Sequence, residues 1–233
     1  MCNILWDFDG TLAYRDGMWS ATLLSLLNKV GINDILIENI RLYLNTGFTW
    51  HNYEYSHKEL FNGKTWDEYY ENYFYEIYIK IGINENISKE LSKNVIIEYM
   101  DKTKWFIYDD VIETLEKAVK YGFKNYVLSN HIPELNKIVE NVGLKNYFYE
   151  ICSSANIGYE KPNIKIYEYV LEKLKVAKNA CIIIGDSFKA DIKGGENIGI
   201  KSILVRAENK ENYKWYCKDL EKILEKIEEI KKQ

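Results

Sequence analysis

Short runs with an apolar centre alternate with helical patterns along the second half of this chain. These runs cover residues 124–129, 149–153, 181–185 and 201–206, and residues 4–6 form a further run of the same kind. Strands that are apolar on both faces are typical of parallel sheets covered by helices on both sides. The pattern therefore predicts an α/β fold, with a Rossmann-like parallel sheet core flanked by helices.

Apolar side chains recur at helical spacing between and beyond these runs. The segments with this spacing are residues 18–30, 111–120, 133–142, 162–174 and 218–232. In the second of them we expect Ile112, Leu115 and Val119 to face the core. The last is expected to be an amphipathic helix that packs on the core.

Residues 15–101 differ from the rest of the chain because they are rich in aromatic side chains and contain no strand-like run. In residues 66–81, the positions 66, 70, 73, 74, 77 and 81 form one apolar helical face, which we interpret as the core of a helical bundle. The sequence thus predicts an α-helical cap of residues 15–101, inserted into a discontinuous core of residues 1–14 and 102–233. We expect this cap to open and close over the core, hinged near residues 13–17 and 101–106.

Composition excludes several classes of protein. The 233 residues are 47% hydrophobic and 28% charged, which is enough apolar material for a packed core, and a net charge of −4 gives no basic surface for nucleic acid. The four cysteines, Cys2, Cys152, Cys181 and Cys217, form no CxxC pair, so we expect free thiols in a reducing compartment. No apolar run is long enough for a membrane span, and we predict a cytoplasmic protein with no membrane partner.

Two carboxylates stand where the first strand ends, in the segment Asp7-Phe8-Asp9-Gly10-Thr11. Side chains at positions i and i+2 of an extended chain point to the same side, so the two acids lie close together and repel each other. A divalent cation between them is the simplest remedy.

The later strands also end in polar residues. Ser129-Asn130 ends the second, Lys161-Pro162 follows the third, and Gly185-Asp186 ends the fourth, with Asp191 shortly after. Because ligands bind at the carboxyl ends of the strands in open α/β sheets, we expect these side chains to form one site.

The four motifs Asp7-x-Asp9-Gly10-Thr11, Ser129-Asn130, Lys161-Pro162 and Gly185-Asp186-x₄-Asp191 resemble those of the haloacid dehalogenase superfamily in order and spacing. The helical insert resembles the cap of the subgroup that includes phosphoglycolate phosphatase and β-phosphoglucomutase. The resemblance implies a hydrolase that acts on small phosphorylated metabolites.

The resemblance also implies roles for the acids. Asp7 would be the nucleophile that forms an aspartyl-phosphate, and Asp9 would be the general acid and base. Asp7, the backbone carbonyl of Asp9, and Asp186 would bind Mg²⁺. Four aspartates and a phosphate ester of about two negative charges need more positive charge than Lys161 supplies, which also favours a metal ion.

The remaining motif residues would hold the phosphoryl group and the acids. Lys161, the hydroxyl of Ser129 and the backbone N–H of Asn130 would bind phosphoryl oxygens. Thr11 and Asp191 would support the metal ligands without binding the metal themselves.

We therefore predict a Mg²⁺-dependent phosphatase, in which cap residues select the substrate. The candidates for that contact are Arg15, Arg41, Trp50 and His51. A phosphosugar mutase of the β-phosphoglucomutase type carries the same four motifs and remains an alternative. A signalling receiver domain is disfavoured because it lacks a helical insert, and a non-catalytic phosphate-ligand binding protein is disfavoured by the intact set of acids.

Overall fold

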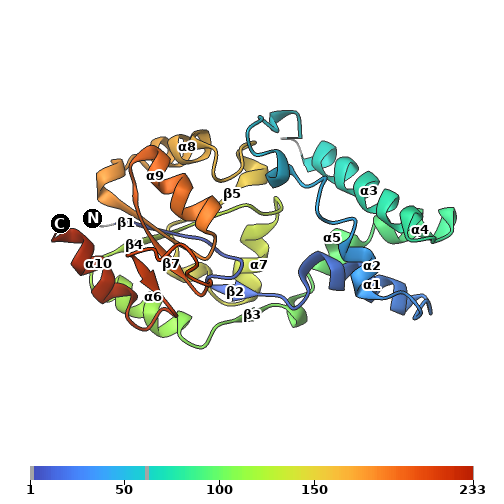
Figure 1. Ribbon diagram of the computed structural model, residues 1–233, viewed down its shortest axis with the longest axis horizontal. Coiled ribbons are helices and arrows are strands. Elements are labelled where there is room, and N and C mark those ends of the chain that lie inside the picture. The colour runs from blue at the N-terminus through green and yellow to red at the C-terminus, as the bar shows by residue number, and fades with distance from the viewer. Residues whose placement is uncertain (1–2, 61–62, 233) are drawn as a thin grey trace.

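The computed structural model describes residues 3–60 and 63–232, so Cys2 and the aromatic Phe61 lie outside the described residues. Figure 1 shows an α/β unit and a helical unit, joined by the two chain segments that contain β2 and β3. Cys152, Cys181 and Cys217 are buried and free. No helix in the described ranges is both long and apolar enough to cross a bilayer.

A six-stranded parallel sheet forms the α/β unit, with the strand order β5-β4-β1-β6-β7-β8. Its strands are β1 (Asn3–Trp6), β4 (Lys124–Ser129), β5 (Glu150–Ser153), β6 (Cys181–Gly185), β7 (Lys201–Val205) and β8 (Tyr216–Cys217). All residues of β1 and β6 are buried, as expected for strands covered on both faces. The predicted α/β fold with a parallel sheet is confirmed.

Helices cover both faces of this sheet (Figure 1). They are α6 (Val111–Lys120), α7 (Leu135–Asn141), α8 (Ile164–Leu174), α9 (Gly194–Ile198) and α10 (Ile223–Lys231), with a π-helical turn, η7 (Phe188–Lys193), before α9. Short 3₁₀ turns lie at η4 (Lys145–Tyr147), η5 (Ser154–Asn156) and η6 (Lys178–Ala180). Alternate residues of β1 point to opposite faces: Leu5 packs in the cluster that contains α8, and Ile4 and Trp6 pack in the cluster that contains α6, α7 and α10.

Three details of the α/β unit differ from the expectations. In α6 the buried side chains include Val111 and Leu115, whereas Ile112 and Val119 are 41% and 50% exposed. Apolar residues lie on two stripes of this helix, and only packing decides which stripe is buried. The C-terminal helix begins at Ile223, later than predicted, because residues 218–222 form bends and a turn. The two-residue strand β8, directly before them, was not predicted.

The helical unit lies between β2 (Ala13–Tyr14) and β3 (Phe106–Ile107), which pair with each other antiparallel. Its helices are α1 (Met18–Lys29), α2 (Ile37–Arg41), α3 (Gly63–Lys80), α4 (Glu85–Ser92) and α5 (Val95–Tyr99), with 3₁₀ turns η1 (Thr49–Asn52), η2 (Lys58–Leu60) and η3 (Lys102–Lys104). Trp66, Tyr70, Phe74 and Ile77 of α3 are buried in the core. We retain residues 15–101 as the proposed extent of the cap.

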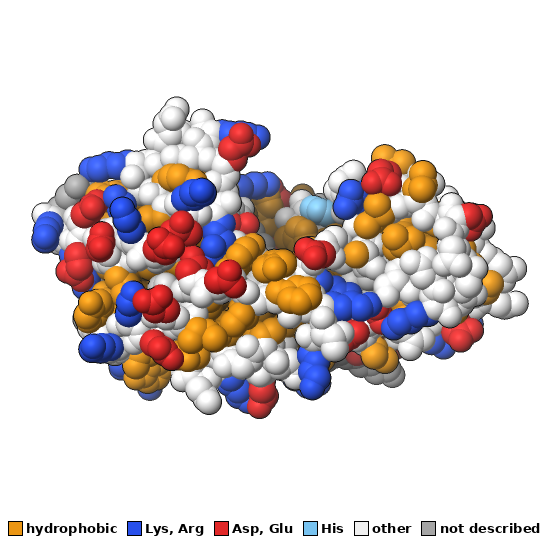
Figure 2. All heavy atoms as spheres, turned by 90° about the horizontal axis from the view of Figure 1, so that it is seen from below, with side chains coloured by type: hydrophobic (Ala, Val, Ile, Leu, Met, Phe, Trp, Pro, Cys, Tyr) orange, Lys and Arg blue, Asp and Glu red, His pale blue; other side chains and the backbone are white. Residues whose placement is uncertain are grey.

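Part of the helical unit rests directly on the α/β unit. Thr49 donates its hydroxyl to Glu160 Oε1 at 2.5 Å, and the backbone N–H of His57 donates to the carbonyl of Gly158 at 2.9 Å. Asn163 Nδ2 donates to the carbonyl of Tyr53 at 2.9 Å. Beside this contact the surface is hollowed between the two units, and hydrophobic side chains and a histidine are visible in the hollow (Figure 2).

Candidate active site

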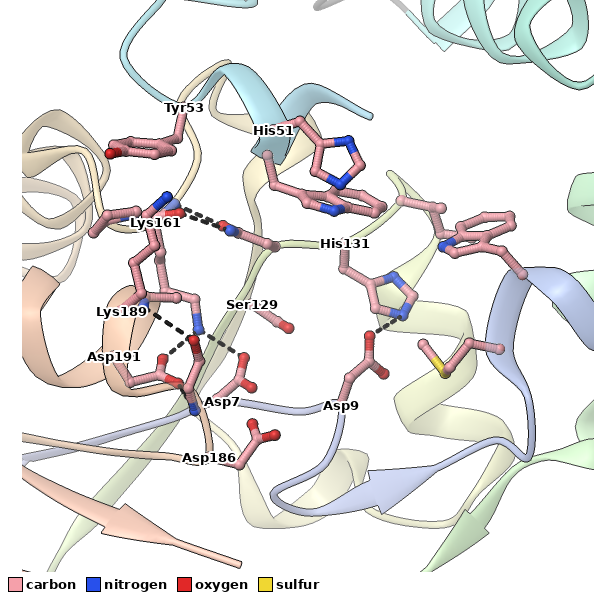
Figure 3. Close-up of a pocket in the computed structure, with 18 of the residues that line it drawn as sticks. Asp7, Asp9, His51, Tyr53, Ser129, His131, Lys161, Asp186, Lys189 and Asp191 are labelled. Atoms are coloured by element: carbon pink, nitrogen blue, oxygen red, sulfur yellow. Dashed lines mark hydrogen bonds and ion pairs between the residues drawn. The ribbon is translucent and has the colours of Figure 1, made fainter. Parts of the chain in front are cut away.

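The strand ends of the sheet bring the predicted motifs together. Trp6, the last residue of β1, lies level with Val127 of β4 and Ile184 of β6. Asp7 follows at once, and its N–H donates to the carbonyl of Ile184 at 2.8 Å. This register places Asp7 beside the ends of both neighbouring strands, as the close-up in Figure 3 shows.

Lys161 connects two of the acids. Its Nζ lies 2.7 Å from Asp7 Oδ1 and 2.6 Å from Asp191 Oδ1, and all three side chains are at most 8% exposed. Burial alone would lower the pKa of Lys161, but the carboxylates of Asp191 and Asp7 raise it above its usual value. The lysine is therefore positively charged in the folded protein.

Asn130 positions the segment that carries this lysine. The Asn130 side chain accepts from the Lys161 N–H at 2.7 Å and donates to the Lys161 carbonyl at 2.9 Å. The Lys161–Pro162 peptide bond is cis. Both polar atoms of the Asn130 side chain are thus bonded to the backbone of Lys161. The group of Asn130 that we assign to phosphate binding is its backbone N–H.

The acids form a donor set that fits a hard cation. Carboxylate oxygens of Asp7, Asp186 and Asp191 lie within 4.8 Å of one another. Burial, followed by repulsion from Asp7 and Asp191, raises the pKa of Asp186 to about 8, and burial with the neighbouring acids raises the pKa of Asp9 well above its usual value. These carboxyl groups resist ionisation because too little positive charge lies near them. A Mg²⁺ ion would supply that charge and stabilise their ionised form.

Asp191 is less free than the others to bind a cation. Its Oδ1 is bound to Lys161, and its Oδ2 accepts from the N–H of Ser187 at 3.0 Å. Thr11 donates its hydroxyl to Asp186 Oδ1 at 3.3 Å. These contacts place Thr11 and Asp191 next to the acids assigned to the metal, as the predicted supporting roles require.

Gly10 is needed for the acids to approach each other. Its φ is +77°, and a Cβ at this position would collide with the carboxylate of Asp186. Only glycine combines this left-handed turn with such a close approach.

A pocket of about 540 Å³ opens above the acids. The predicted site residues that line it are Asp7, Asp9, Trp50, His51, Ser129, Asn130, Lys161, Asp186 and Asp191. In Figure 3, His51 and Tyr53 lie on the side of the pocket opposite Asp7 and Asp186. Residues of both units therefore line one pocket.

The two arginines are placed elsewhere. Arg15 is buried, lies 5.6 Å from the ring centre of Tyr99 and donates from Nε to Thr22 Oγ1 at 3.2 Å. Arg41 is exposed in α2, with its nearest ion-pair partner, Glu38, at 3.6 Å. Neither is among the described residues that line the pocket, so we do not carry their predicted substrate contact into the proposed function.

Several pocket residues were not predicted, and His131 is the most notable. Its Nε2 lies 3.6 Å from Asp9 Oδ2, its side chain is fully buried, and burial lowers its pKa to about 4. Its only signal in the sequence is its place directly after Ser129-Asn130. Lys189 was also missed; its Nζ lies 4.1 Å from the ring centre of Tyr53, and so joins the two units across the pocket.

Comparisons with known proteins identify the family. A family model for haloacid dehalogenase-like hydrolases matches residues 4–205. Glyceraldehyde 3-phosphate phosphatase from Methanothermobacter thermautotrophicus is 31% identical over 103 residues, which cover 43% of this chain and 45% of that protein. Phosphoglycolate phosphatase from Aquifex aeolicus is 27% identical over 202 residues, which cover 86% of this chain and 83% of that protein. The chain thus spans less than half the length of the first relative and most of the second.

Solved structures share the whole fold. The crystal structure of the HAD-hydrolase YfnB from Bacillus subtilis, bound to magnesium, superposes with a TM-score of 0.73 at 21% identity, covering 96% of both chains. At this identity the likeness concerns the fold, including the presence of a helical unit beside the parallel sheet.

Proposed function

The chain belongs to the haloacid dehalogenase-like hydrolase family, and from that premise we propose that it is a Mg²⁺-dependent phosphatase of small phosphorylated metabolites. The observation that carries the proposal is the buried lysine bridge: Lys161 holds Asp7 and Asp191 at the floor of a pocket whose wall includes Asp9. The relatives named as phosphatases support the same reaction type.

In the first half of the proposed reaction Asp7 attacks the phosphorus atom. Its Oδ1 accepts a hydrogen bond from Lys161, and we assign the attack to its other oxygen. A bond forms between this oxygen and phosphorus, the ester P–O bond breaks, and Asp9 donates its proton to the departing alcohol oxygen. The raised pKa of Asp9 suits a group that must carry a proton at this step.

In the second half Asp9, now ionised, takes a proton from water as the water oxygen attacks the phosphorus. The bond between Asp7 and phosphorus breaks, which releases inorganic phosphate and restores the Asp7 carboxylate. Ser129, the N–H of Asn130 and Lys161 bind phosphoryl oxygens throughout. Mg²⁺ would be held by Asp7, Asp186 and the carbonyl of Asp9, where it neutralises charge on the phosphoryl oxygens.

The pocket wall favours one kind of substrate. Trp19, Trp50, Tyr53 and Tyr99 contribute aromatic side chains to it. Such side chains stack well on a flat aromatic group. We therefore propose a phosphate ester that carries an aromatic ring, and we place the phosphosugar mutase second.

The test is a panel of phosphate esters assayed for phosphate release with and without Mg²⁺. Uridine 5′-monophosphate and ribose 5-phosphate form a matched pair, since they share the ribose 5-phosphate group and differ at C1′, where one carries the base and the other a hydroxyl. We expect release that depends on Mg²⁺, with a higher kcat/KM for the nucleotide. Release that requires an added sugar bisphosphate would favour the mutase.

Asp7→Asn separates catalysis from binding. We expect this variant to fold normally and to lose all turnover, whereas the exposed control Asp34→Asn keeps it. Wild-type turnover in Asp7→Asn would refute the aspartyl-phosphate mechanism. Tight substrate binding with no turnover in either the wild type or the variant would favour a binding protein.

A further inference from the structure

The side chains of His131 and Asp9 face each other. Asp9 Oδ2 lies 3.6 Å from His131 Nε2, and this is the contact drawn between them in Figure 3. Asp9 Oδ1 and both ring nitrogens of His131 are buried and have no hydrogen-bond partner. Each side chain therefore offers the other a polar contact within reach of a hydrogen bond.

The surroundings of the histidine ring are apolar. The rings of Phe8, Tyr99 and Trp105 have their centres 5.8–6.0 Å from that of His131. A buried polar group without a hydrogen bond costs about 1–3 kcal/mol, so an apolar side chain would suit this cage better. A histidine at such a position points to a role in the reaction and not in stability.

The backbone of His131 is held in place on the other side. Its N–H donates to Ser154 Oγ at 3.1 Å, and its carbonyl accepts from Ser153 Oγ at 2.6 Å. Three rings and two backbone hydrogen bonds thus determine where the imidazole points. This rigidity is what a group that orients another side chain requires.

We propose that His131 is a positioning residue for Asp9, and that it holds the Asp9 carboxyl group toward the oxygen of the leaving alcohol. The proposal rests on the proposed function, in which Asp9 is the general acid. At 3.6 Å the two atoms are slightly too far apart for a hydrogen bond, and such contacts often tighten only when substrate is bound. The Nε2 of a neutral imidazole can accept a hydrogen bond from the protonated Asp9 carboxyl, or, in the other tautomer, donate its N–H to the Asp9 carboxylate.

The experiment compares His131→Met with His131→Gln, because the two side chains have similar size and only glutamine offers a hydrogen bond near the position of Nε2. The substrates are ribose 5-phosphate, whose alcohol needs a proton to leave, and p-nitrophenyl phosphate, whose phenolate leaves without one. The quantity measured is kcat/KM, which reports the step in which the ester bond breaks. Asp9→Asn is the reference for complete loss of the acid.

We expect His131→Met to lose at least about tenfold in kcat/KM on ribose 5-phosphate and less than about threefold on p-nitrophenyl phosphate, since general acid catalysis contributes 10²–10⁴-fold in all. His131→Gln should recover most of the loss. If His131→Met fails to fold, His131→Phe fills the same apolar cage and serves in its place.

Two outcomes would overturn the proposal in distinguishable ways. If Asp9→Asn loses the same factor on both esters, the acid role of Asp9 fails and the positioning role fails with it. If Asp9→Asn discriminates between the esters but His131→Met loses nothing, or loses equally on both, the acid role stands and the positioning role is wrong.

Discussion

The carboxylate of Glu98 joins three segments of the helical unit, and its loss has a calculable effect. Glu98, in α5, accepts a hydrogen bond from Ser25 at 2.7 Å and forms ion pairs with Lys29 and Lys104. Burial alone would raise its pKa, but these bonds lower it to about 2. The next residue, Tyr99, lines the pocket and packs against His131, so this cluster supports one wall of the site.

A pKa that falls from 4.5 to about 2 corresponds to roughly 3 kcal/mol of stability. Lys29 and Lys104 are 57% and 34% exposed, so water and salt weaken their share of this energy. We therefore expect Glu98→Gln to reduce the free energy of unfolding by about 1–2 kcal/mol near neutral pH.

The sign of the pH dependence follows from the direction of the shift. Because the pKa of Glu98 is lower in the folded than in the unfolded protein, its stabilisation is complete above about pH 4.5 and is lost as the pH falls toward 2. The difference between the wild type and Glu98→Gln should therefore be constant above about pH 5 and shrink steadily as the pH falls from about 5 toward 2.

Urea unfolding followed by tryptophan fluorescence, at a series of pH values, measures this difference directly. Glu90→Gln, at an exposed position in α4, is the matched control and should unfold like the wild type. A difference between the wild type and Glu98→Gln that is the same at low and neutral pH would refute the reasoning. So would a Glu98→Gln variant as stable as the wild type at neutral pH.

Three further changes test the site. Lys161→Met leaves two buried carboxylates without their counter-charge, so turnover should be lost and thermal unfolding should show a destabilisation of about 3 kcal/mol; a wild-type melting curve would contradict this. Removing Mg²⁺ with EDTA should abolish phosphate release, and adding it back should raise the melting temperature of the wild type but not of Asp186→Asn; an equal rise in both would argue against Asp186 as a ligand. Thr49→Val removes the hydroxyl bonded to Glu160, so we expect a loss of about 1–2 kcal/mol and a higher KM, whereas the exposed control Thr46→Val should change neither.

The strands could be predicted closely from the sequence because they are buried on both faces. The runs at residues 124–129 and 181–185 coincide with β4 and β6 to the residue, since polar or glycine residues bound each apolar run. The buried stripe of α6 could not be predicted, because two apolar stripes compete on that helix. The strand β8 has only two residues and forms by pairing with β7, so no local sequence pattern predicts it.

The acids and the lysine of the site were predictable for a related reason. Asp7 and Asp186 follow β1 and β6 directly, so a correct strand assignment already places them at the carboxyl edge of the sheet. Lys161 and Asp191 lie beyond η5 and within η7, and their order and spacing relative to the other motifs identified them. The positions of Arg15 and Trp50 could not be predicted in this way, because the packing of the helical unit decides which of its side chains reach the pocket. Trp50 lines the pocket, and Arg15 is buried against Tyr99.

The surroundings of His131 could not be predicted from local sequence patterns. Phe8 stands between the two acids of the first motif, Tyr99 ends α5, and Trp105 follows η3, so the cage combines segments about 90 residues apart. Tyr99 and Trp105 flank the chain segment that returns from the helical unit to the core. Tyr99 belongs to the helical unit, whereas His131 follows β4 of the sheet. On the role that we propose for His131, the orientation of Asp9 therefore depends in part on a ring that the helical unit supplies.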